Sequence, residues 1–330
     1  MPLPPAPTPD SGYDVVTPCD RSLMASTFLP IKRFFRRVLG VETIQREQHG
    51  HDARSARAAL LLGNALTAAR LDPADLRALP EYGRVAEVAA LLRTSRVDGA
   101  EMVRLGGELD GGYVMLDTLR PPAVTFGYGF GVGHDVSWDA AVADRGIDLV
   151  LYDHTVAALP APVPRARFVR QGVCGATRQP RCRTLEEAVS DNGHTGRTDL
   201  VLKMDIEGAE WEALAAAPSA TLSCFSQMAL EFHGMSRAVT PRGHAEIVAV
   251  LAKLARTHCP LHVHGNNALP PLWLGDLVLP DVLEVTWVRR ADHAGRLVPR
   301  DEPFPTVLDR PNVPDRPDII LGRTFSAPRG

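Results

Sequence analysis

The chain has 330 residues, of which 45% are hydrophobic and 23% are charged, and its formal net charge is −3. This composition is typical of a folded soluble protein, and the length suits one large domain with an accessory segment. The weak charge gives no reason to expect nucleic acid as a partner. No apolar run reaches the roughly 20 residues that a membrane-spanning helix needs, and we expect a cytoplasmic protein.

The cysteine pattern also favours a cytoplasmic protein. They are odd in number, widely spaced and without a C-x-x-C pair: Cys19, Cys174, Cys182, Cys224 and Cys259. This pattern is typical of reduced, mostly buried thiols rather than of a disulfide framework.

The first hundred residues differ in character from the rest. Residues 1–53 are Pro-rich and then basic, which predicts an arm without a packed core. Its segment 28–39 mixes Phe and Leu with Lys and Arg, a pattern compatible with contact to a membrane surface, although a docking arm or loose tail is the better interpretation. Residues 54–100 carry Ala, Leu and Arg at helical spacing, which predicts a helical cover. Residues 101–330 are expected to form the main domain.

The main domain opens with a predicted hairpin. Residues 103–116 contain two short β-like segments around the turn Asp110-Gly111-Gly112. A glycine-rich turn also exposes N–H groups that, with Arg104, are able to hold a carboxylate. The residues of this segment alone favour the plain turn.

A strand, a glycine series and an acid follow in order. A strand is predicted over residues 123–126, and a second buried strand over 147–152 ends in Asp153. Between them, glycines at alternate positions let the backbone approach a ligand closely. They are Gly127, Gly129 and Gly131. Asp153 lies about 20 residues after the last of them, which is the spacing at which an acid binds ribose hydroxyls.

The glycine pattern is not the G-x-G-x-x-G of dinucleotide-binding proteins. That register presents a helix N-terminus to a pyrophosphate. A ribose-bearing ligand without phosphates therefore fits better, and S-adenosylmethionine is such a ligand.

The stretch that organises the chain is TDLVLKMDIEGAEW, residues 198–211. Its apolar run 200–204 predicts a buried strand, and Asp205 and Glu207 follow at once. Ligands of open α/β sheets bind at the carboxyl ends of the strands, where these acids are expected. The alternative, a solvated acidic helix start, explains Glu210 well and Asp205 less well.

Strands and helices alternate along residues 101–330, which predicts a mostly parallel, doubly wound α/β sheet. Polar groups recur at the ends of its successive strands, so we expect them to line one cleft. They are Gly127 to Gly131, Asp153, Asp205, Glu231 with His233, and Asn266 with Asn267.

Five segments resemble the FkbM-type methyltransferases and their methyltransferase-like relatives. They are residues 104–114, 125–138, 152–154, 199–214 and 281–290. The most specific is K-x-D-x-E-G-A-E-W, and the resemblance spans the chain from about residue 100 to about residue 320. It implies a Rossmann-like class I sheet of seven strands whose last strand is antiparallel, S-adenosylmethionine as cofactor, and O-methylation of a sugar, polyketide or other small-molecule hydroxyl. The helical N-terminal extension lies outside it.

The resemblance also implies cofactor contacts by position. From the methionine end to the adenine they are Asp110 and Gly111 with Arg104 at the carboxylate, Gly127, Gly129 and Gly131 along the methionine, Asp205 beside the sulfonium, Asp153 at the ribose, and Val173 with Cys174 at the adenine.

Methyl transfer to a hydroxyl requires alignment of the two reactants and removal of the hydroxyl proton by a base or a metal. We predict His233 as the base, with Asp205 and Glu207 as the other catalytic side chains. A partly buried histidine at a strand end, without a catalytic role, is an equal alternative. Mg²⁺ held by Asp205 and Glu231 is the other candidate activator, although no ligand spacing requires it.

Two other functions remain open on the sequence. Asp205-x-Glu207 after a short strand also suits the metal-binding pair of a nucleotide-sugar glycosyltransferase. That class does not need the glycine series with Asp153. The third interpretation is a non-catalytic scaffold that binds S-adenosylmethionine, because a fold alone does not establish a reaction.

Overall fold

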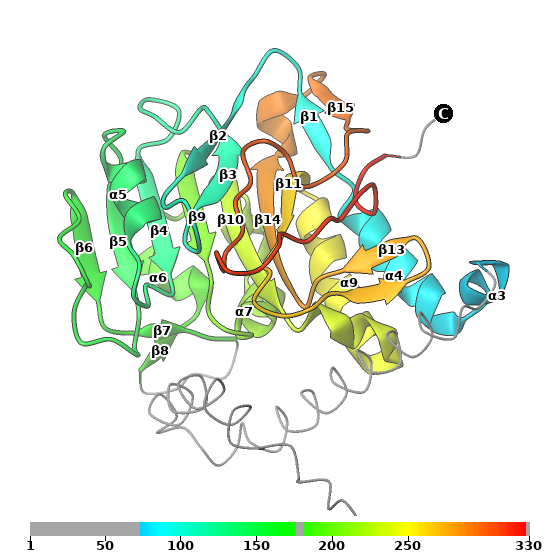
Figure 1. Ribbon diagram of the computed structural model, residues 1–330. Coiled ribbons are helices and arrows are strands. Elements are labelled where there is room, and N and C mark those ends of the chain that lie inside the picture. The colour runs from blue at the N-terminus through cyan, green and yellow to red at the C-terminus, as the bar shows by residue number, and fades with distance from the viewer. Residues whose placement is uncertain (1–72, 176–180, 328–330) are drawn as a thin grey trace, which may run out of the picture. The chain divides into compact units, whose positions relative to one another are not determined.

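The computed structural model describes residues 73–175 and 181–327 (Figure 1). The chain divides into two compact units, Met1–Glu47 and Gln48–Gly330, and every described residue belongs to the second. Within the described ranges, no helix has the length and apolar character needed to cross a membrane.

A seven-stranded mixed sheet forms the centre of the second unit. Its strands in chain order are β4 (Phe126–Phe130), β5 (Asp148–Tyr152), β6 (Ala166–Val169), β9 (Leu200–Met204), β10 (Phe225–His233), β11 (His258–Gly265) and β14 (Val282–Arg289). Across the sheet the order is β6–β5–β4–β9–β10–β14–β11 (Figure 1). β14 is antiparallel to both neighbours, β10 and β11. An α/β fold with a seven-stranded sheet whose last strand is antiparallel is therefore confirmed, and it is compatible with a Rossmann-like architecture.

Short elements complete the unit. The helices are α3 (Pro73–Arg77), α4 (Pro80–Leu91), α5 (Ser137–Ala143), α6 (Leu185–Asp191), α7 (Glu210–Ala216), α8 (Ser219–Leu222), α9 (Pro241–Ala255), η1 (Met235–Val239) and η2 (Arg290–His293). The two-stranded pairs are β1 (Ser95–Val97) with β15 (Leu297–Pro299), β2 (Met102–Leu105) with β3 (Tyr113–Leu116), β7 (Gly172–Val173) with β8 (Cys182–Arg183), and β12 (Leu272–Leu274) with β13 (Leu277–Leu279).

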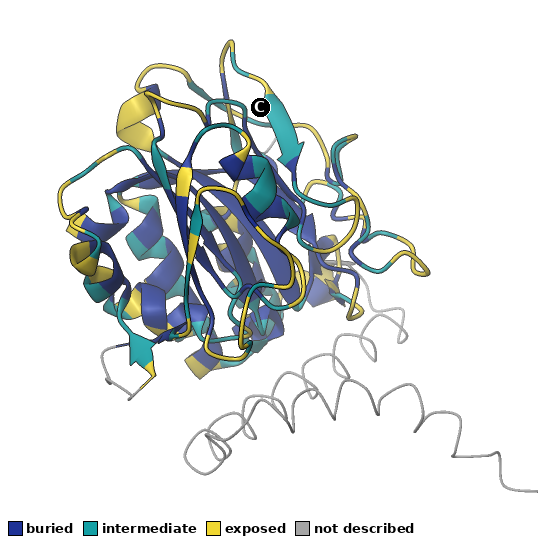
Figure 2. Cartoon of the chain, turned by 90° about the vertical axis from the view of Figure 1, so that its left-hand side faces the viewer, coloured by how far each residue is buried: buried dark blue, intermediate teal, exposed yellow. Residues whose placement is uncertain are grey.

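Both faces of the sheet are buried, as a parallel sheet requires. In β9, Leu200, Leu202 and Met204 join the core beneath α4, α6, α7 and α9, while Val201 joins the core beneath α5 and the β2–β3 hairpin. Figure 2 shows the resulting dark-blue sheet between partly exposed helices. This alternation explains why the segment is apolar throughout.

The predicted hairpin is confirmed, and two further local features support the fold. The segment around Asp110 is an antiparallel hairpin, β2–β3. Helix α6 begins with a capping box in which Thr184 and Glu187 bond reciprocally. Residues 282–289, within the last segment of the resemblance, form the strand β14.

The N-terminal expectations are seen only in part. The arm over residues 1–53, including its segment 28–39, and the stretch 54–72 lie outside the described residues. The described part of the expected helical cover contains α3 and α4 and then the strand β1. Residues 95–97 are therefore strand rather than helix, because they pair with β15 near the C-terminus.

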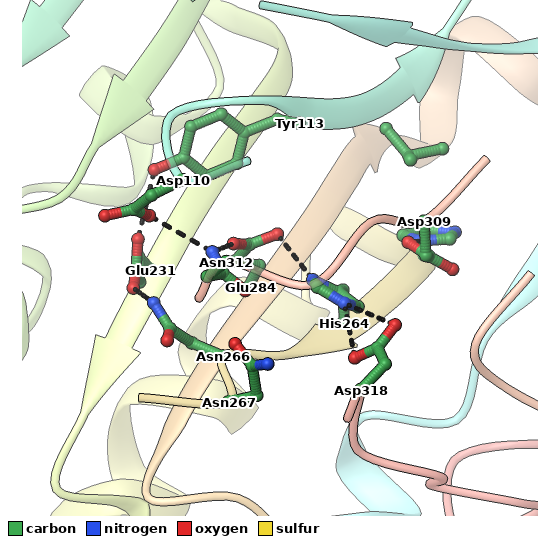
Figure 3. Close-up of polar contacts among 12 residues, drawn as sticks. Asp110, Tyr113, Glu231, His264, Asn266, Asn267, Glu284, Asp309, Asn312 and Asp318 are labelled. Carbon is green, nitrogen blue, oxygen red and sulfur yellow. Dashed lines mark hydrogen bonds and ion pairs between the residues drawn. The ribbon is translucent and has the colours of Figure 1, made fainter. Parts of the chain in front are cut away.

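The C-terminal segment 304–319, hereafter the strap, is fastened to β11 and to the loop after it. His262 Nε2 lies 2.7 Å from Asp309 Oδ1, and His264 Nε2 lies 3.1 Å from Asp318 Oδ1. The side chain of Asn267 accepts from Val313 N at 2.7 Å. These contacts hold the strap beside the carboxyl ends of the central strands (Figure 3).

Candidate active site

Polar groups of five neighbouring strands meet at one edge of the sheet. We call this set the polar row: Gly131 after β4, Asp205 after β9, Glu231 in β10, Glu284 in β14 and His264 in β11. Glu231 pairs in register with Glu284, and Glu284 pairs in register with His264. Asp205 directly follows Met204, which pairs with Leu230. Gly131, Asp205 and Glu231 were expected from the strand ends, whereas His264 and Glu284 were not. Glu284 is at this edge because β14 runs the other way and begins here.

The row crosses the point where the chain reverses its direction of travel across the sheet. From β4 the chain proceeds to β5 and β6 on one side, and from β9 it proceeds to β10 on the other. β4 and β9 are adjacent and parallel. The ends of these two strands are therefore a topological switch point, which is where open α/β sheets bind ligands.

The turn after β4 is built around Gly131 and Asp153. Gly131 has φ +81°, and a Cβ there would lie 1.6 Å from the backbone oxygen of Asp205. Asp153, at the end of β5, accepts through Oδ2 from Val132 N and Gly133 N, each at 2.9 Å, and through Oδ1 from Thr155 N at 2.6 Å. Burial acts to raise the pKa of Asp153, but these hydrogen bonds outweigh it and the pKa is lowered. Asp153 is thus an ionised anchor of the turn.

The expected strand and glycine loop need a correction. The strand β4 spans residues 126–130, so Gly127 and Gly129 lie inside it rather than in a loop. A Cβ on Gly127 would lie 2.4 Å from Leu149 Cδ2, and one on Gly129 would lie 2.8 Å from Asp139 Oδ1. These two glycines make room for neighbouring side chains of the fold. Gly131 and Gly133 form the turn that approaches the switch point.

Gly131→Ala tests this assignment. We expect a loss of about 3 kcal/mol in the free energy of unfolding, since left-handed backbone strain adds to a clash that the sheet is unable to relieve. Gly133→Ala is the matched control, because Gly133 also has positive φ but has open space around its Cβ position. It should cost about 1 kcal/mol. Equal losses in urea unfolding would show that the contact with Asp205 is unimportant.

Lys203 is a functional candidate that the sequence analysis treated only as part of a strand. It is 5% exposed, its Nζ donates to Gly131 O at 3.1 Å and lies 3.9 Å from Asp205 Oδ2. Burial acts to lower its pKa, but the surrounding carboxylates, Asp205 and Asp139 first among them, raise it above the ordinary value. Lys203 therefore ties the ends of β4 and β9 together as a buried cation. The sequence feature that could have identified Lys203 is its charge within an otherwise apolar strand.

His233 lies among three carboxylates. Its Nδ1 is 3.2 Å from Glu210 Oε1, and its Nε2 is 3.6 Å from Glu207 Oε2 and 3.9 Å from Asp205 Oδ1. Burial acts to lower the pKa of His233, but the hydrogen bond and charge of Glu210 outweigh it and hold the pKa well above its usual value. The surrounding carboxylates therefore favour the protonated imidazolium form of the ring.

Glu210 is not the solvated helix acid that the sequence suggested. Its side chain is fully buried, and it accepts from His233 N at 2.6 Å and from Gly208 N at 2.8 Å. Glu207, by contrast, has φ +57° and a side chain that is 62% exposed. Glu210, the second acid of the E-G-A-E string, is therefore a buried residue that holds His233 in place. Glu207, the first acid, is largely exposed at the surface of the site.

The hairpin covers the row from above (Figure 3). Tyr113 donates to Glu231 Oε2 at 3.1 Å, and Asp110 accepts from Asn312 of the strap at 3.1 Å. Gly111 has φ +84° and lies against Asp135. Arg104 donates to the carbonyls of residues 107 and 109, so it braces the turn.

Val173 and Cys174 lie after β6, and both are buried. The backbone N–H of Cys174 donates to Arg183 O at 2.9 Å beside the β7–β8 pair. The four cysteines in the described ranges are free thiols, as expected. Burial, together with the neighbouring Cys174, raises the pKa of Cys182, so that thiol is protonated.

Two groups of side chains in the described ranges have metal-binding character. Asp205, Glu231 and His233 form one, and Asp110, Glu231 and Glu284 form the other; in each, the ligand atoms lie within 4.8 Å of one another. The first contains the predicted pair Asp205 and Glu231. Neither contains Glu207.

The structure thus brings most predicted residues to one edge. Gly131, Asp205 and Glu231 belong to the row, and Asp110, His233 and Asp153 lie beside it. Lys203, Tyr113, Glu284 and Asn312 were not predicted from the sequence. Comparison of the chain with models of protein families finds no match, and comparison with curated proteins also finds none.

Proposed function

We propose that the chain is an S-adenosylmethionine-dependent methyltransferase that methylates a hydroxyl of a small molecule or glycan. The observation that carries this proposal is the pair of features at the switch point, the Gly131 turn and the Asp153 carboxylate at the end of the neighbouring strand. A close backbone approach and an acid at the second strand end suit a nucleoside ligand. The resemblance to FkbM-type methyltransferases proposes the same ligand.

The charge of the edge supports this cofactor over a phosphate-bearing one. S-adenosylmethionine carries a sulfonium and an ammonium against one carboxylate, so its net charge is positive, whereas a nucleotide sugar carries an anionic diphosphate. Asp205, Glu231 and Glu284 make the edge acidic, and the nearby cation Lys203 is already engaged by Gly131 O and Asp205. An uncompensated diphosphate would meet like charge here.

Binding also requires a local exchange of partners. Both oxygens of Asp153 already accept hydrogen bonds from the turn and from Thr155. A ribose diol would have to share or displace some of these donors. Val173 and Cys174 are proposed to lie beside the adenine, and the turn of Asp110 and Gly111 beside the methionine end of the cofactor.

We assign His233 as the base, with Asp205 and Glu207 at the face where the acceptor binds. Glu210 holds Nδ1, which leaves Nε2 directed at Asp205 and Glu207. A carboxylate that orients an imidazole in this way is a common arrangement for general bases. Because the pKa of His233 is raised, the ring must first lose a proton before it acts as a base.

This assignment predicts a pH dependence. The neutral ring is the active form, and its fraction grows with pH until the raised pKa of His233 is passed. We therefore expect kcat to rise about tenfold per pH unit above pH 7. His233→Gln should keep cofactor affinity while kcat falls by about 10²-fold or more and loses this slope. A flat wild-type profile, or full activity of the variant, would remove His233 as the base.

The glycosyltransferase alternative has less support in the geometry. It needs Asp205 and Glu207 to share one metal ion, but the groups with metal-binding character combine Asp205 with Glu231 and His233. A scaffold that binds S-adenosylmethionine without turnover differs from our proposal only in the chemistry. Product formation with a hydroxyl acceptor distinguishes those two.

A further inference from the structure

Two buried glutamates face each other across the strands β10 and β14. Glu231 and Glu284 are in register, on the same face, and are 3% and 5% exposed. Like charges directly opposite each other on a sheet are destabilising, and burial increases the cost. A carboxylate oxygen of Asp110, from the hairpin turn, joins them within 4.8 Å.

Neighbouring donors orient both glutamates. Glu231 accepts from Tyr113 Oη at 3.1 Å and from Asn266 Nδ2 at 3.0 Å. Glu284 Oε2 lies 3.2 Å from His264 Nδ1 (Figure 3). Such bonds fix a carboxylate without using all its lone pairs, as outer-shell partners do around metal ligands.

An independent observation comes from the strap. Asn312 is 6% exposed, and its Nδ2 donates to Asp110 Oδ1 at 3.1 Å and to Glu284 Oε1 at 2.7 Å. Its Oδ1 is buried and has no hydrogen-bond partner among the described residues. A half-turn of this amide would direct the oxygen at the carboxylates, an arrangement that a cation between them would make favourable. The strap thus inserts a buried carboxamide with an unused acceptor into an acidic cluster.

We infer that Asp110, Glu231 and Glu284, with the amide of Asn312, form a binding site for one divalent cation. All the ligand atoms are oxygens, which suits Mg²⁺, Mn²⁺ or Ca²⁺. The ion relieves the repulsion between the paired glutamates and supplies a partner for Asn312 Oδ1. The inference goes beyond the proposed methyl transfer and holds whether or not the chain transfers a methyl group.

The competing group, Asp205 with Glu231 and His233, shares one ligand with this site. His233 faces carboxylates with both ring nitrogens, Glu210 on one side and Glu207 with Asp205 on the other. That arrangement is an ion pair and leaves no free nitrogen for a metal. The all-oxygen group is therefore the better site.

Mn²⁺ titration of the EDTA-treated, dialysed full chain tests the inference by calorimetry. We expect one Mn²⁺ per chain. Glu284→Gln and Asp110→Asn should each weaken binding at least about tenfold. Asn312→Asp adds a carboxylate and should tighten binding. His233→Asn, from the competing group, and Asp315→Asn, an exposed acid of the strap, should leave affinity unchanged.

Three results would overturn the inference. Wild-type chain that binds no Mn²⁺ at millimolar concentration would show that the glutamates share protons instead. Loss of binding in His233→Asn with retention in Glu284→Gln would place the ion on the competing group. Weaker binding by a folded Asn312→Asp would exclude the strap from the site. Circular dichroism in EDTA establishes that each variant is folded. If Glu284→Gln does not fold, the wild-type titration alone tests whether the chain binds Mn²⁺.

Discussion

Glu210→Ala is expected to lower the free energy of unfolding by about 3–5 kcal/mol. Glu210 is fully buried and accepts from two backbone N–H groups, Gly208 N and His233 N, while it also faces the His233 ring. Removing it leaves a buried imidazolium and two donors without their acceptor. Breaking a buried pair in this way costs more than the pair itself contributes, because the remaining partner stays desolvated.

The measurement is urea unfolding of the purified chain. Glu212→Ala is the matched control, since it removes an exposed acid from the same helix, α7. It should change stability by less than about 0.5 kcal/mol. Similar effects of the two substitutions would show that Glu210 is an ordinary helix acid after all.

Asp153→Ala is expected to weaken binding of S-adenosylhomocysteine by about 1.5–3 kcal/mol, or roughly 10- to 150-fold. The carboxylate is proposed to bind the ribose, and it also holds the turn through Val132 N and Gly133 N. The substitution therefore removes a ligand contact and loosens the backbone that approaches the ligand.

Asp153→Asn separates these two effects. An amide retains one acceptor for the turn but loses the charge that favours two hydroxyl donors. It should bind the cofactor more weakly than wild type and more tightly than Asp153→Ala in calorimetry. Unchanged affinity of a folded Asp153→Ala would remove this residue from the site.

The sequence predicted the fold well because the pattern that determines it is local. The apolar run 200–204 and the alternation of side-chain types over 282–289 are each enough to predict a strand. One exception was residues 123–130, where glycines within a strand look like a loop. These strand positions require glycine because a Cβ would clash with the side chains of Leu149 and Asp139, which are distant in sequence. Another exception was residues 95–97, which are strand rather than helix.

The site was only partly predictable for the same reason. Asp205, Glu231 and His233 lie at strand ends and were found. Glu284 reaches the site because β14 is antiparallel, and Asn312 reaches it because His262 and His264 fasten the strap. No local sequence pattern predicts either arrangement. A solvated helix start explained Glu210 well, because the first turn of a helix favours acids. Its burial follows from the packing of α7 against β10.

The most direct test of the proposed function is isothermal titration of the wild-type chain with S-adenosylmethionine, S-adenosylhomocysteine and uridine diphosphate glucose, with and without Mg²⁺. We predict micromolar binding of the first two ligands and no binding of the third. Binding of uridine diphosphate glucose alone would contradict the account and would make Asp205-x-Glu207 the metal pair of a glycosyltransferase.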